Sequence, residues 1–478
     1  MPAKCYRLFP NERSPHHTSI PQAAKGQAVK SRSFALATDL YELTMAAAYF
    51  CNDIRAVATF ELFVRELPAD RRFLLVAGIE QILEYLEELR FTDEDIAYLR
   101  AHPSFASVPQ DFFDYLEEFR FTGEVWAMPE GTPAFAGEPI VRVTAPILQA
   151  QIVETFLLAT VNFQTMIASK AARVVGAARG KPVIEFGSRR AHGSEAAMYA
   201  ARAAYIGGCT GTSNVEAGLR FGVPTFGTIA HSWVMSFDDE LAAFEHFMRT
   251  FPGSTTLLID TYDSVAAARK IVSAGLRPQA VRLDSGDLAA LSREVRRILD
   301  DGGLRDTRIF ASGDLDEYRI DELLRLGAPI DAFGVGTRLS TSSDAPNLGG
   351  VYKLVEVVTD HQAKGKVKTS PGKVTLPGRK QVWRASDASG TYTEDWIALA
   401  DEPAPVASAE PLLRCVLQNG ARTERAPALQ EVRERALANV ARLPADLRRL
   451  ERGAGLPVRI TPRLAEEQRR VAASCTGR

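Results

Sequence analysis

The runs VIEFG (183–187), TLLID (256–260), AVRLDS (280–285) and RIFAS (308–312) alternate with stretches whose apolar residues recur at helical spacing. Three further runs of the same kind are CTGTS (209–213), TFGTIA (225–230) and AFGVGT (332–337). The helical stretches between the runs span residues 194–205, 214–222, 238–250, 264–275, 287–303 and 316–327. Alternation of strands and helices at this spacing predicts parallel strands joined by crossover helices. Residues 181–339 are therefore expected to form an α/β barrel.

Polar or glycine residues stand at or just after the end of every predicted strand. They are Arg189, Ser213, His231, Asp260, Asp284, Asp314 and Thr337. Ligands of β/α barrels and open α/β sheets bind at the C-terminal ends of the strands. Packing alone does not explain such a recurring pattern, which predicts that the barrel is catalytic.

Bulk composition fits a globular protein with two or three domains. The chain has 478 residues, 46% hydrophobic and 24% charged, and a net charge of −2. This charge gives no reason to expect nucleic acid or an anionic membrane as a partner. The five cysteines lie far apart without CxxC spacing, which favours a reducing cytoplasm. The most apolar long run, 146–163, carries Gln149, Glu154 and Asn162 and predicts a buried helix, not a membrane span.

The segments that flank the barrel predict a second domain. Helices are expected from near Leu40, where Thr38 or Asp39 can cap, and over 76–91, 92–102 with Thr92 as cap, and 109–121. A strand is expected at 58–68, a β meander at 123–146 and a further strand at 349–360. We therefore predict a mixed α+β domain from residues 34–146 and 345–400, with the barrel at 147–344 opening on a long helix, 147–175. Residues 1–33 are predicted to be a mobile tail and 401–478 a helical extension with frayed last residues.

Two groups of residues predict chemistry at the barrel mouth. Arg282 and Asp284 in RLDSGDL alternate with apolar neighbours and so share one strand face, whereas Asp287 is better explained as a helix cap. The turns in ASGDLDEYRIDEL (311–323) and AFGVGTRLS (332–340) offer glycines and free backbone amides on the last two strands. Barrels commonly hold a phosphate there, so these turns predict a phosphate cradle.

Other signals were weighed against plainer explanations. The chain has no GxxxxGK[ST] loop, and GVGTRL lacks the third glycine of a dinucleotide fingerprint. A lone histidine is more often a core residue, but its strand-end position favours a functional role for His231; His192 and His246 are assigned no role. The basic segment 364–385 is explained as a solvated hairpin, except for a possible polyphosphate-facing set, Lys373, Arg379 and Lys380.

Nine segments of the chain resemble nicotinate phosphoribosyltransferases, in order, from about residue 36 to about 400. They are TDLYELTMA, FELFVRELP, EFGSRRAHG, GTSNVEAG, GTIAHSWVMSF, VRLDSGDL, ASGDLDE, FGVGTRL and GKVTLPGRKQVWR. The resemblance implies the type II phosphoribosyltransferase fold, an irregular β/α barrel beside a mixed α+β domain built from both ends of the chain. It also implies a cytoplasmic homodimer with shared active sites. Residues 1–33 and 405–478 lie outside the resemblance.

The implied reaction joins nicotinate and phosphoribosyl pyrophosphate into nicotinate mononucleotide and pyrophosphate, coupled to ATP hydrolysis. His231 resembles the transiently phosphorylated histidine, Arg282 and Arg189 the substrate-pocket arginines, and Asp284 the ribose-side carboxylate. The resemblance also implies that Phe186 and Tyr41 stack on the ring and that Thr212 and Ser213 bind substrate. It implies that Arg65 contacts pyrophosphate. The residues implied to hold the phosphates and ribose are Gly313, Asp314, Gly334, Gly336 and Thr337.

Physical chemistry is consistent with that reaction. Loss of pyrophosphate from an anomeric carbon develops oxocarbenium character, so the site must hold phosphates with amides, cations and Mg²⁺. A weak pyridine nucleophile needs orientation, which an aromatic clamp with cationic ends supplies. Two alternatives stay open: a related transferase acting on nicotinamide or quinolinate, and a non-catalytic nucleotide-binding paralogue.

Overall fold

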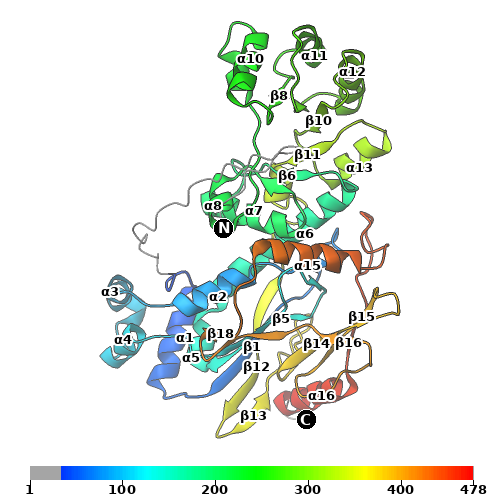
Figure 1. The fold of residues 1–478 in the computed structure, drawn as a ribbon. Coiled ribbons are helices and arrows are strands. Elements are labelled where there is room, and N and C mark those ends of the chain that lie inside the picture. Colours follow the sequence, from blue (N-terminus) through cyan, green and yellow to red (C-terminus); the bar gives the residue numbers. More distant parts are fainter. Residues whose placement is uncertain (1–33, 477–478) are drawn as a thin grey trace. The chain divides into compact units, whose positions relative to one another are not determined.

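A computed structural model describes residues 34–476, which form two compact units (Figure 1). One unit holds residues 167–346, and the other holds the described residues up to 166 together with those from 347 onward. The division falls inside helix α6 (Glu154–Ala177), whereas the sequence placed it at residue 147. Residues 401–476 belong to the second unit, although the sequence predicted a separate extension.

A parallel six-stranded sheet is the centre of the first unit. Its strand order is β7-β6-β11-β10-β9-β8, and every pair is parallel. The strands are β6 (Val183–Glu185), β7 (Gly211–Thr212), β8 (Thr256–Leu258), β9 (Ala280–Leu283), β10 (Arg308–Ala311) and β11 (Ala332–Val335). An isolated parallel bridge between Thr212 and Thr225 extends the sheet at the β7 edge. The predicted α/β fold with an irregular barrel is confirmed.

Helices follow the strands of this sheet, and all of them except the short α9 and α14 were predicted from the sequence. They are α7 (Ser194–Ile206), α8 (Val215–Phe221), α9 (His231–Met235), α10 (Glu240–Thr250), α11 (Ser264–Ser273), α12 (Leu288–Asp301), α13 (Glu317–Arg325) and α14 (Thr337–Ser340). The Asp287 side chain accepts from the N–H groups of Ala289 and Ala290, which confirms it as the cap of α12. Helices α11 and α12 lie side by side, and α12 packs against β9 and β10 (Figure 1).

The predicted strand TFGTIA (225–230) does not form. Only Thr225 pairs with the sheet, and the Phe226 N–H donates to Thr212 O at 2.9 Å. Pro224 has no N–H to give to a ladder and Gly227 has no side chain to pack, and both weaken a strand. The Phe226 ring is nevertheless buried in a core layer with Ile184 and Phe310. His231 therefore begins the short helix α9 instead of ending a strand.

Sheets whose strands pair antiparallel, except for the parallel pair β15 and β19, build the second unit. The larger has the order β13-β12-β1-β5-β3-β17-β18, the next β16-β14-β15-β19, and β2 pairs with β4. In chain order, the strands of this unit begin with β1 (Val57–Val64), β2 (Leu74–Leu75), β3 (Glu124–Ala127), β4 (Pro133–Ala134), β5 (Pro139–Pro146), β12 (Gly350–Thr359), β13 (Gln362–Gly365) and β14 (Lys380–Ser386). The others are β15 (Tyr392–Leu399), β16 (Ala409–Pro411), β17 (Arg414–Gln418), β18 (Ala421–Arg422) and β19 (Val458–Ile460). Both ends of the described chain thus contribute to one unit.

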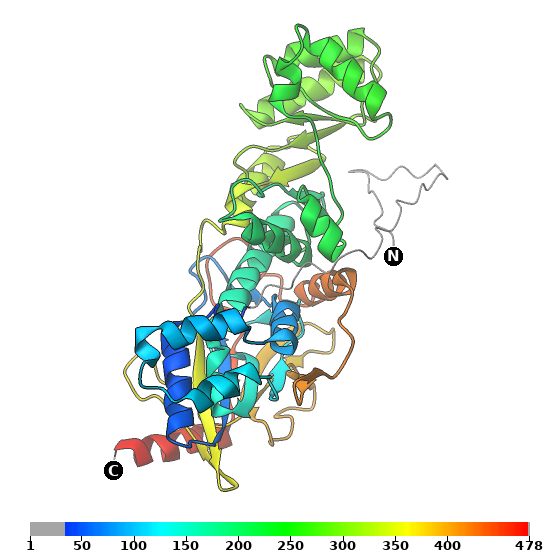
Figure 2. The ribbon, with the colours of Figure 1, turned by 90° about the vertical axis from the view of Figure 1, so that its left-hand side faces the viewer.

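Helices of this unit cover the sheets. They are α1 (Leu40–Cys51), α2 (Ile79–Glu88), α3 (Asp93–Ala101), α4 (Gln110–Glu117), α5 (Ile147–Ile152), α15 (Leu429–Ala441) and α16 (Pro462–Thr476), with a 3₁₀ turn at Pro103–Phe105. Helix α5 packs on β1 and β5, α1 packs on α5, and α16 packs on β15 (Figure 2). Thr92 caps α3 in a capping box with Asp95, as predicted. The single long helix predicted over 147–175 is instead divided at Val153.

The C-terminal segment departs from its prediction in two ways. It contributes four short strands as well as helices, and residues 467–476, which were expected to be frayed, lie in α16. Strand β17 pairs with β3, and β19 pairs with β15. These partners are far away in the sequence, so local hydrophobic periodicity gives no signal for such strands.

Lys380 is a core residue and not part of a polyphosphate-facing set. Its side chain is 3% exposed, and its ammonium lies 2.9 Å from a carboxylate oxygen of the fully buried Glu61 and donates to the carbonyls of Leu376 and Gly378. Burial lowers the pKa of Lys380, which the Glu61 carboxylate opposes. Arg379, next to it, is half exposed and pairs with Glu356.

A buried carboxyl group anchors the N-terminal turn of α1. The Glu42 side chain accepts from Thr38 Oγ1 and from the Thr155 hydroxyl at 2.6 Å and N–H at 3.1 Å. Burial raises the pKa of Glu42 to about 7. Between about pH 4.5 and pH 7 the folded state therefore keeps a proton on Glu42 that the unfolded chain has lost. The contribution of this group to stability is complete below about pH 4.5 and is lost as the pH rises to about 7.

We expect Glu42→Gln to flatten the pH dependence of stability between pH 5 and pH 8, because an amide keeps the neutral form at both values. The urea midpoint of the variant should exceed that of the wild type at pH 8 and differ little at pH 5. Glu88→Gln, at the exposed end of α2, is the matched control and should follow the wild type. Parallel pH profiles for wild type and Glu42→Gln would contradict the assignment.

Candidate active site

An arginine, a carboxylate and a hydroxyl form one network at the ends of β9 and β10. Arg282 donates through Nε to Ser312 Oγ at 2.7 Å and through Nη2 to Asp284 Oδ1 at 2.5 Å. The Ser312 hydroxyl donates to the same Asp284 oxygen at 2.5 Å. The Arg282 side chain is 12% exposed and the Asp284 side chain is 27% exposed, so the pair is largely buried but still accessible at the strand ends. The sequence prediction that Arg282 and Asp284 lie together is met by this geometry.

The network keeps Asp284 ionised. Burial by itself raises its pKa, but the Arg282 guanidinium and the Ser312 hydroxyl outweigh burial, and the pKa lies below its usual range. A charged carboxylate can accept hydrogen bonds from hydroxyl groups of a sugar. Its second oxygen, Oδ2, faces His231.

Asp260, after β8, supports Asp284 from the neighbouring strand. Its Oδ2 accepts from the Asp284 N–H at 3.0 Å and from the Ser285 hydroxyl at 2.6 Å. Its Oδ1 is buried and has no hydrogen-bond partner among residues 34–476. The unused oxygen can accept from a ligand or bind a cation.

His231 lies beside Asp284 even though its predicted strand is missing. Its Nδ1 is 3.2 Å from Thr261 Oγ1, and its Nε2 is 3.8 Å from Asp284 Oδ2. The His231 side chain is 43% exposed, so a ligand can reach the ring. The Thr261 hydroxyl holds the ring in place, and this contact could not be foreseen from the sequence.

An aromatic ring lies next to the network. The Arg282 guanidinium carbon is 5.6 Å from the centroid of the Phe186 ring. The centroids of the Phe186 and Phe310 rings are also 5.6 Å apart. A Cβ at position 334 would approach the Phe186 ring to 2.7 Å. Glycine at 334 therefore makes room for the ring, a steric role distinct from phosphate binding.

The two predicted cradle turns lie at the ends of β10 and β11. Gly313 has φ +93°, and a Cβ there would fall 1.9 Å from the Asp284 carbonyl oxygen, so only glycine fits. Asp314, which follows, also has a positive φ, of 47°. Gly336 and Thr337 form the turn after β11, where a Cβ on Gly336 would lie 3.1 Å from Phe186 O. Both turns are thus pressed against the strand ends that carry Asp284 and Phe186.

A buried carboxyl group, Glu185, supports the ends of β6 and β7. It accepts from the Thr212 hydroxyl at 2.6 Å and from the Gly187 N–H, and its carbonyl accepts from the Ser213 N–H at 3.0 Å. Burial raises the pKa of Glu185. The sequence analysis assigned Glu185 no role. Its one signal was a carboxylate inside the otherwise apolar run VIEFG.

Three predicted residues are not part of this network. Arg189 is exposed after β6. Tyr41 and Arg65 belong to the other unit. Tyr41 is 47% exposed, and burial together with the carboxylates of Glu154 and Glu42 raises its pKa. The Arg65 backbone N–H donates to Gly349 O at 3.4 Å.

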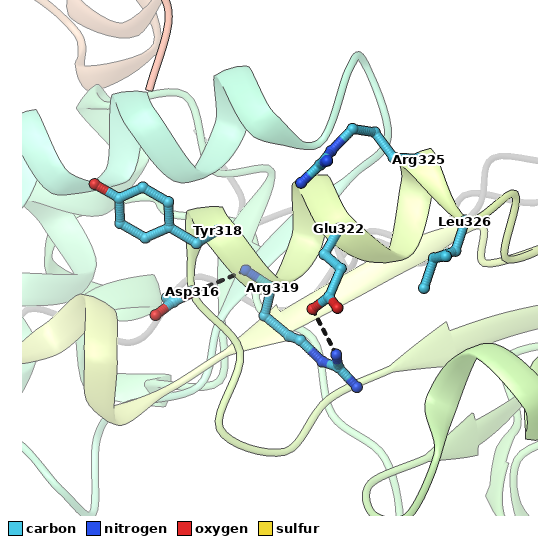
Figure 3. Close-up of a pocket in the computed structure, with 6 residues that line it drawn as sticks. All are labelled: Asp316, Tyr318, Arg319, Glu322, Arg325 and Leu326. Atoms are coloured by element: carbon cyan, nitrogen blue, oxygen red, sulfur yellow. Dashed lines mark hydrogen bonds and ion pairs between the residues drawn. The ribbon is translucent and has the colours of Figure 1, made fainter. Parts of the chain in front are cut away.

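A surface hollow runs along one side of α13 (Figure 3). The side chains around it are outward-facing and partly paired with each other, for example Arg319 with Glu322 at 2.6 Å. Asp316 is engaged as the cap of the helix, accepting from the Arg319 N–H at 2.9 Å. The residues around the hollow show no convergent chemistry, so we place the candidate site at the strand ends.

Residues 34–476 contain neither a ready-made metal site nor a membrane-spanning helix. No cluster of three or more His, Cys, Asp or Glu side chains is arranged to hold a metal ion by itself. No helix in this range combines the length and the apolar character that crossing a membrane requires.

Family models match nearly the whole described chain. The nicotinate phosphoribosyltransferase N-terminal domain matches residues 36–162, the nicotinate phosphoribosyltransferase family 182–388, and the C-terminal domain of the same enzymes 405–468. The last match corrects the sequence analysis, which left residues 405–478 outside the resemblance.

Known proteins give the same result. The chain is 45% identical over 452 residues to a nicotinate phosphoribosyltransferase of Mycobacterium tuberculosis, covering 93% of this chain and 95% of the relative. It is 46% identical over 384 residues to the Bacillus subtilis nicotinate phosphoribosyltransferase, covering 78% of each. Its structure matches the crystal structure of human nicotinic acid phosphoribosyltransferase with a TM-score of 0.80, at 30% identity, over 91% of this chain and 99% of that one. The chain belongs to the nicotinate phosphoribosyltransferase family.

Proposed function

We propose that the protein transfers the phosphoribosyl group of phosphoribosyl pyrophosphate to the ring nitrogen of nicotinate, the entry step from nicotinate into NAD. The products are nicotinate mononucleotide and pyrophosphate. One observation carries the proposal within the site: the ionised pair Arg282–Asp284 lies beside the Phe186 ring, with one glycine turn against Asp284 and a second against Phe186. Such a site offers a surface for an aromatic ring, a cation for a carboxylate and amides for phosphates.

Nicotinate binding falls to Phe186 and Arg282 in this proposal. Arg282 donates to Ser312, Asp284 and Thr228, the last at 2.8 Å, which occupies three of its N–H groups. A guanidinium has five, so two remain that the described residues do not use. These can donate to the nicotinate carboxylate while the ring stacks on Phe186. Ser213, Thr212 and Arg189 complete the pocket, and Tyr41 covers the ring.

Transfer then needs positioning more than acid–base chemistry. The pyridine nitrogen attacks C1 of the ribose, the C1–N bond forms, and the C1–O bond to pyrophosphate breaks with its electron pair on the leaving oxygen. Asp284 accepts from ribose hydroxyl groups and, being negative, stabilises the oxocarbenium charge. Backbone amides of the two cradle turns and the Arg65 cation hold the phosphates, so the reacting atoms stay aligned.

The residues present also fit a Mg²⁺ ion bound together with the substrate. Mg²⁺ is usually held by one or two carboxylates plus substrate phosphates and water. The unpartnered Asp260 Oδ1 and the Asp284 carboxylate supply such oxygens, and a site of this kind needs no third protein ligand. When bound, the ion would neutralise charge on the leaving pyrophosphate.

ATP coupling is assigned to His231. With its proton on Nδ1 donated to Thr261 Oγ1, the ring presents the Nε2 lone pair, which attacks the γ-phosphorus of ATP and releases ADP. The phosphohistidine then adds negative charge next to Asp284 and the cradle turns, and its hydrolysis returns the free enzyme. This charge is how ATP hydrolysis would drive a reversible transfer.

We further propose that the enzyme works in the cytoplasm as a homodimer. Among residues 34–476, Cys51, Cys209 and Cys415 form no disulfide with one another, which is typical of a protein of a reducing compartment. Tyr41 lies on α1, in the unit that does not carry the strand-end network. We propose that the neighbouring subunit donates Tyr41 over the pyridine ring.

The proposed function is tested by offering the purified protein nicotinate, nicotinamide or quinolinate with phosphoribosyl pyrophosphate, with and without ATP, and identifying the mononucleotide by mass spectrometry. We expect product from nicotinate, and more of it with ATP. Ser213→Asp should reduce kcat/KM for nicotinate far more than for nicotinamide, since an aspartate repels the carboxylate and accepts from an amide N–H.

Ser213→Ala is the matched control, because it removes the hydroxyl without adding a charge. It should weaken nicotinate use only modestly. Product from nicotinamide or quinolinate in preference to nicotinate would favour the related-transferase alternative, and no product from any of the three would favour a non-catalytic role.

His231→Asn should abolish substrate-stimulated ATP hydrolysis while slow, ATP-independent transfer continues, because the phosphates still bind the cradle turns. Wild-type protein incubated with γ-labelled ATP should carry label that acid releases, since a phosphoramidate is acid-labile and a phosphoserine is not. Thr261→Val should label more slowly, as the ring loses its orienting contact. Acid-stable label, or full ATPase activity in His231→Asn, would contradict the role of His231.

Mixing Tyr41→Ala with Asp284→Ala protein tests the shared site. Each variant alone is expected to be inactive, and subunit exchange should create heterodimers with one intact site, restoring up to about a quarter of wild-type activity. Exchange is verified separately with differently tagged chains. A verified heterodimer without activity would show that Tyr41 acts within its own subunit.

A further inference from the structure

A fully buried lysine on α6, Lys170, pairs with one residue beyond each of the two cradle turns. The Lys170 side chain is 2% exposed, and its ammonium lies 2.6 Å from Glu317 Oε2 and 2.8 Å from Asp344 Oδ1. Arg173, one turn further along α6, donates through Nε to Glu317 Oε1 at 3.0 Å. Each carboxylate oxygen of Glu317 thus meets a cation, and the two cations balance the two carboxylates.

Each carboxylate belongs to the segment that follows one of the cradle turns. Glu317 is the first residue of α13, directly after its cap Asp316 and three residues beyond Asp314. Asp344 lies shortly after α14, the helical turn that begins at Thr337. Because Gly313 touches the Asp284 carbonyl, the first turn is already fixed at its N-terminal side. Lys170 fixes the C-terminal side of this turn through Glu317 and the C-terminal side of the second turn through Asp344.

The energetics of burial favour a positional role over a stabilising one. Burying an ammonium and two carboxylates carries a large desolvation cost, and well-packed apolar side chains often give equal or greater stability. What an ion cluster supplies and apolar packing does not is a defined direction and distance between the segments it links. Arg173 adds to this order by donating to the Tyr318 hydroxyl at 3.0 Å, on the next residue of α13.

We infer that Lys170 is a positioning residue for phosphoribosyl pyrophosphate: by pairing with Glu317 and Asp344 at once, it sets the spacing of the two phosphate-binding turns. The inference deepens the proposed function and rests on it. Lys170 itself is enclosed behind the turns and touches no substrate. Its loss is therefore expected to disturb the sites for the phosphates and to leave the pocket for the nicotinate ring, at the ends of β6 and β9, unchanged.

The test is the separate measurement of both Michaelis constants in Lys170→Met. We expect KM for phosphoribosyl pyrophosphate to rise about 10- to 100-fold, because displacement of about 1 Å can change rates by a factor of 100. KM for nicotinate should stay within about twofold, and kcat should fall less than kcat/KM, as loss of ground-state binding predicts. Calorimetry with inorganic pyrophosphate should show weakened binding of the same order.

Two further variants separate positioning from general destabilisation. Ile271→Ala on α11 removes a buried side chain elsewhere in the same unit and should lower Tm without a selective change in KM. Lys170→Met/Asp344→Asn should raise KM for phosphoribosyl pyrophosphate no further than Lys170→Met alone, since the two residues act through one contact. A selective KM increase in Ile271→Ala, or additive effects in the double variant, would overturn the inference.

Asp344→Asn keeps the readout available if Lys170→Met does not fold, because it leaves the Lys170–Glu317 pair in place. It should raise KM for phosphoribosyl pyrophosphate in the same direction by a smaller factor, and an unchanged value would refute the role of Lys170. Wild-type protein that makes nicotinate mononucleotide while Lys170→Met and Asp344→Asn keep normal KM values would overturn this inference alone. Wild-type protein that makes no product would remove the proposed function, and the inference with it.

Discussion

The strand-end site depends on how Asp284 is held. Its side chain accepts from Arg282 and Ser312, its N–H is bound by Asp260, and its carbonyl oxygen lies where only a glycine at 313 can pass. Contacts of one residue thus join the ends of β8, β9 and β10. Because the contacts hold the backbone N–H, the carbonyl side and one carboxylate oxygen of Asp284, the carboxylate has little freedom to rotate, and its other oxygen faces His231.

Charge burial is handled differently in the two units. In the second unit, Arg384 pairs with Asp395 through two hydrogen bonds and lies over the Tyr392 ring, while burial and Asp395 raise the pKa of Glu138 well above its usual range. These groups are enclosed and have no access to ligand. At the strand ends, by contrast, the side chains of His231 and Asp284 are 43% and 27% exposed. Ionisable groups that a ligand can reach, and not enclosed ones, mark this part of the molecule as the candidate site.

The sequence predicted the parallel sheet and most of its helices because strand–helix alternation is a local pattern. Arg282 and Asp284 were found for the same reason, since period-two alternation places them on one face of β9. Three features could not be predicted in this way. TFGTIA has the composition of a strand but lacks a partner beyond Thr225. Lys380 was assigned to a polyphosphate-facing set but is buried against Glu61 from a distant strand, and β19 exists only because β15 is beside it. Each of these depends on contacts between residues far apart in the chain.

The missing strand has a mechanical consequence. Asp284 is attached to β9, which is hydrogen-bonded on both sides, whereas His231 follows a segment that leaves the sheet after Phe226. The two side chains lie 3.8 Å apart but differ in how easily they move. Moving His231 breaks no strand pairing, whereas moving Asp284 breaks its hydrogen bonds with Asp260 and Ser312. If His231 is phosphorylated as proposed, the repulsion from Asp284 would be relieved mainly by movement of the segment around α9. Asp284 would then keep its position and provide the fixed reference for the reaction.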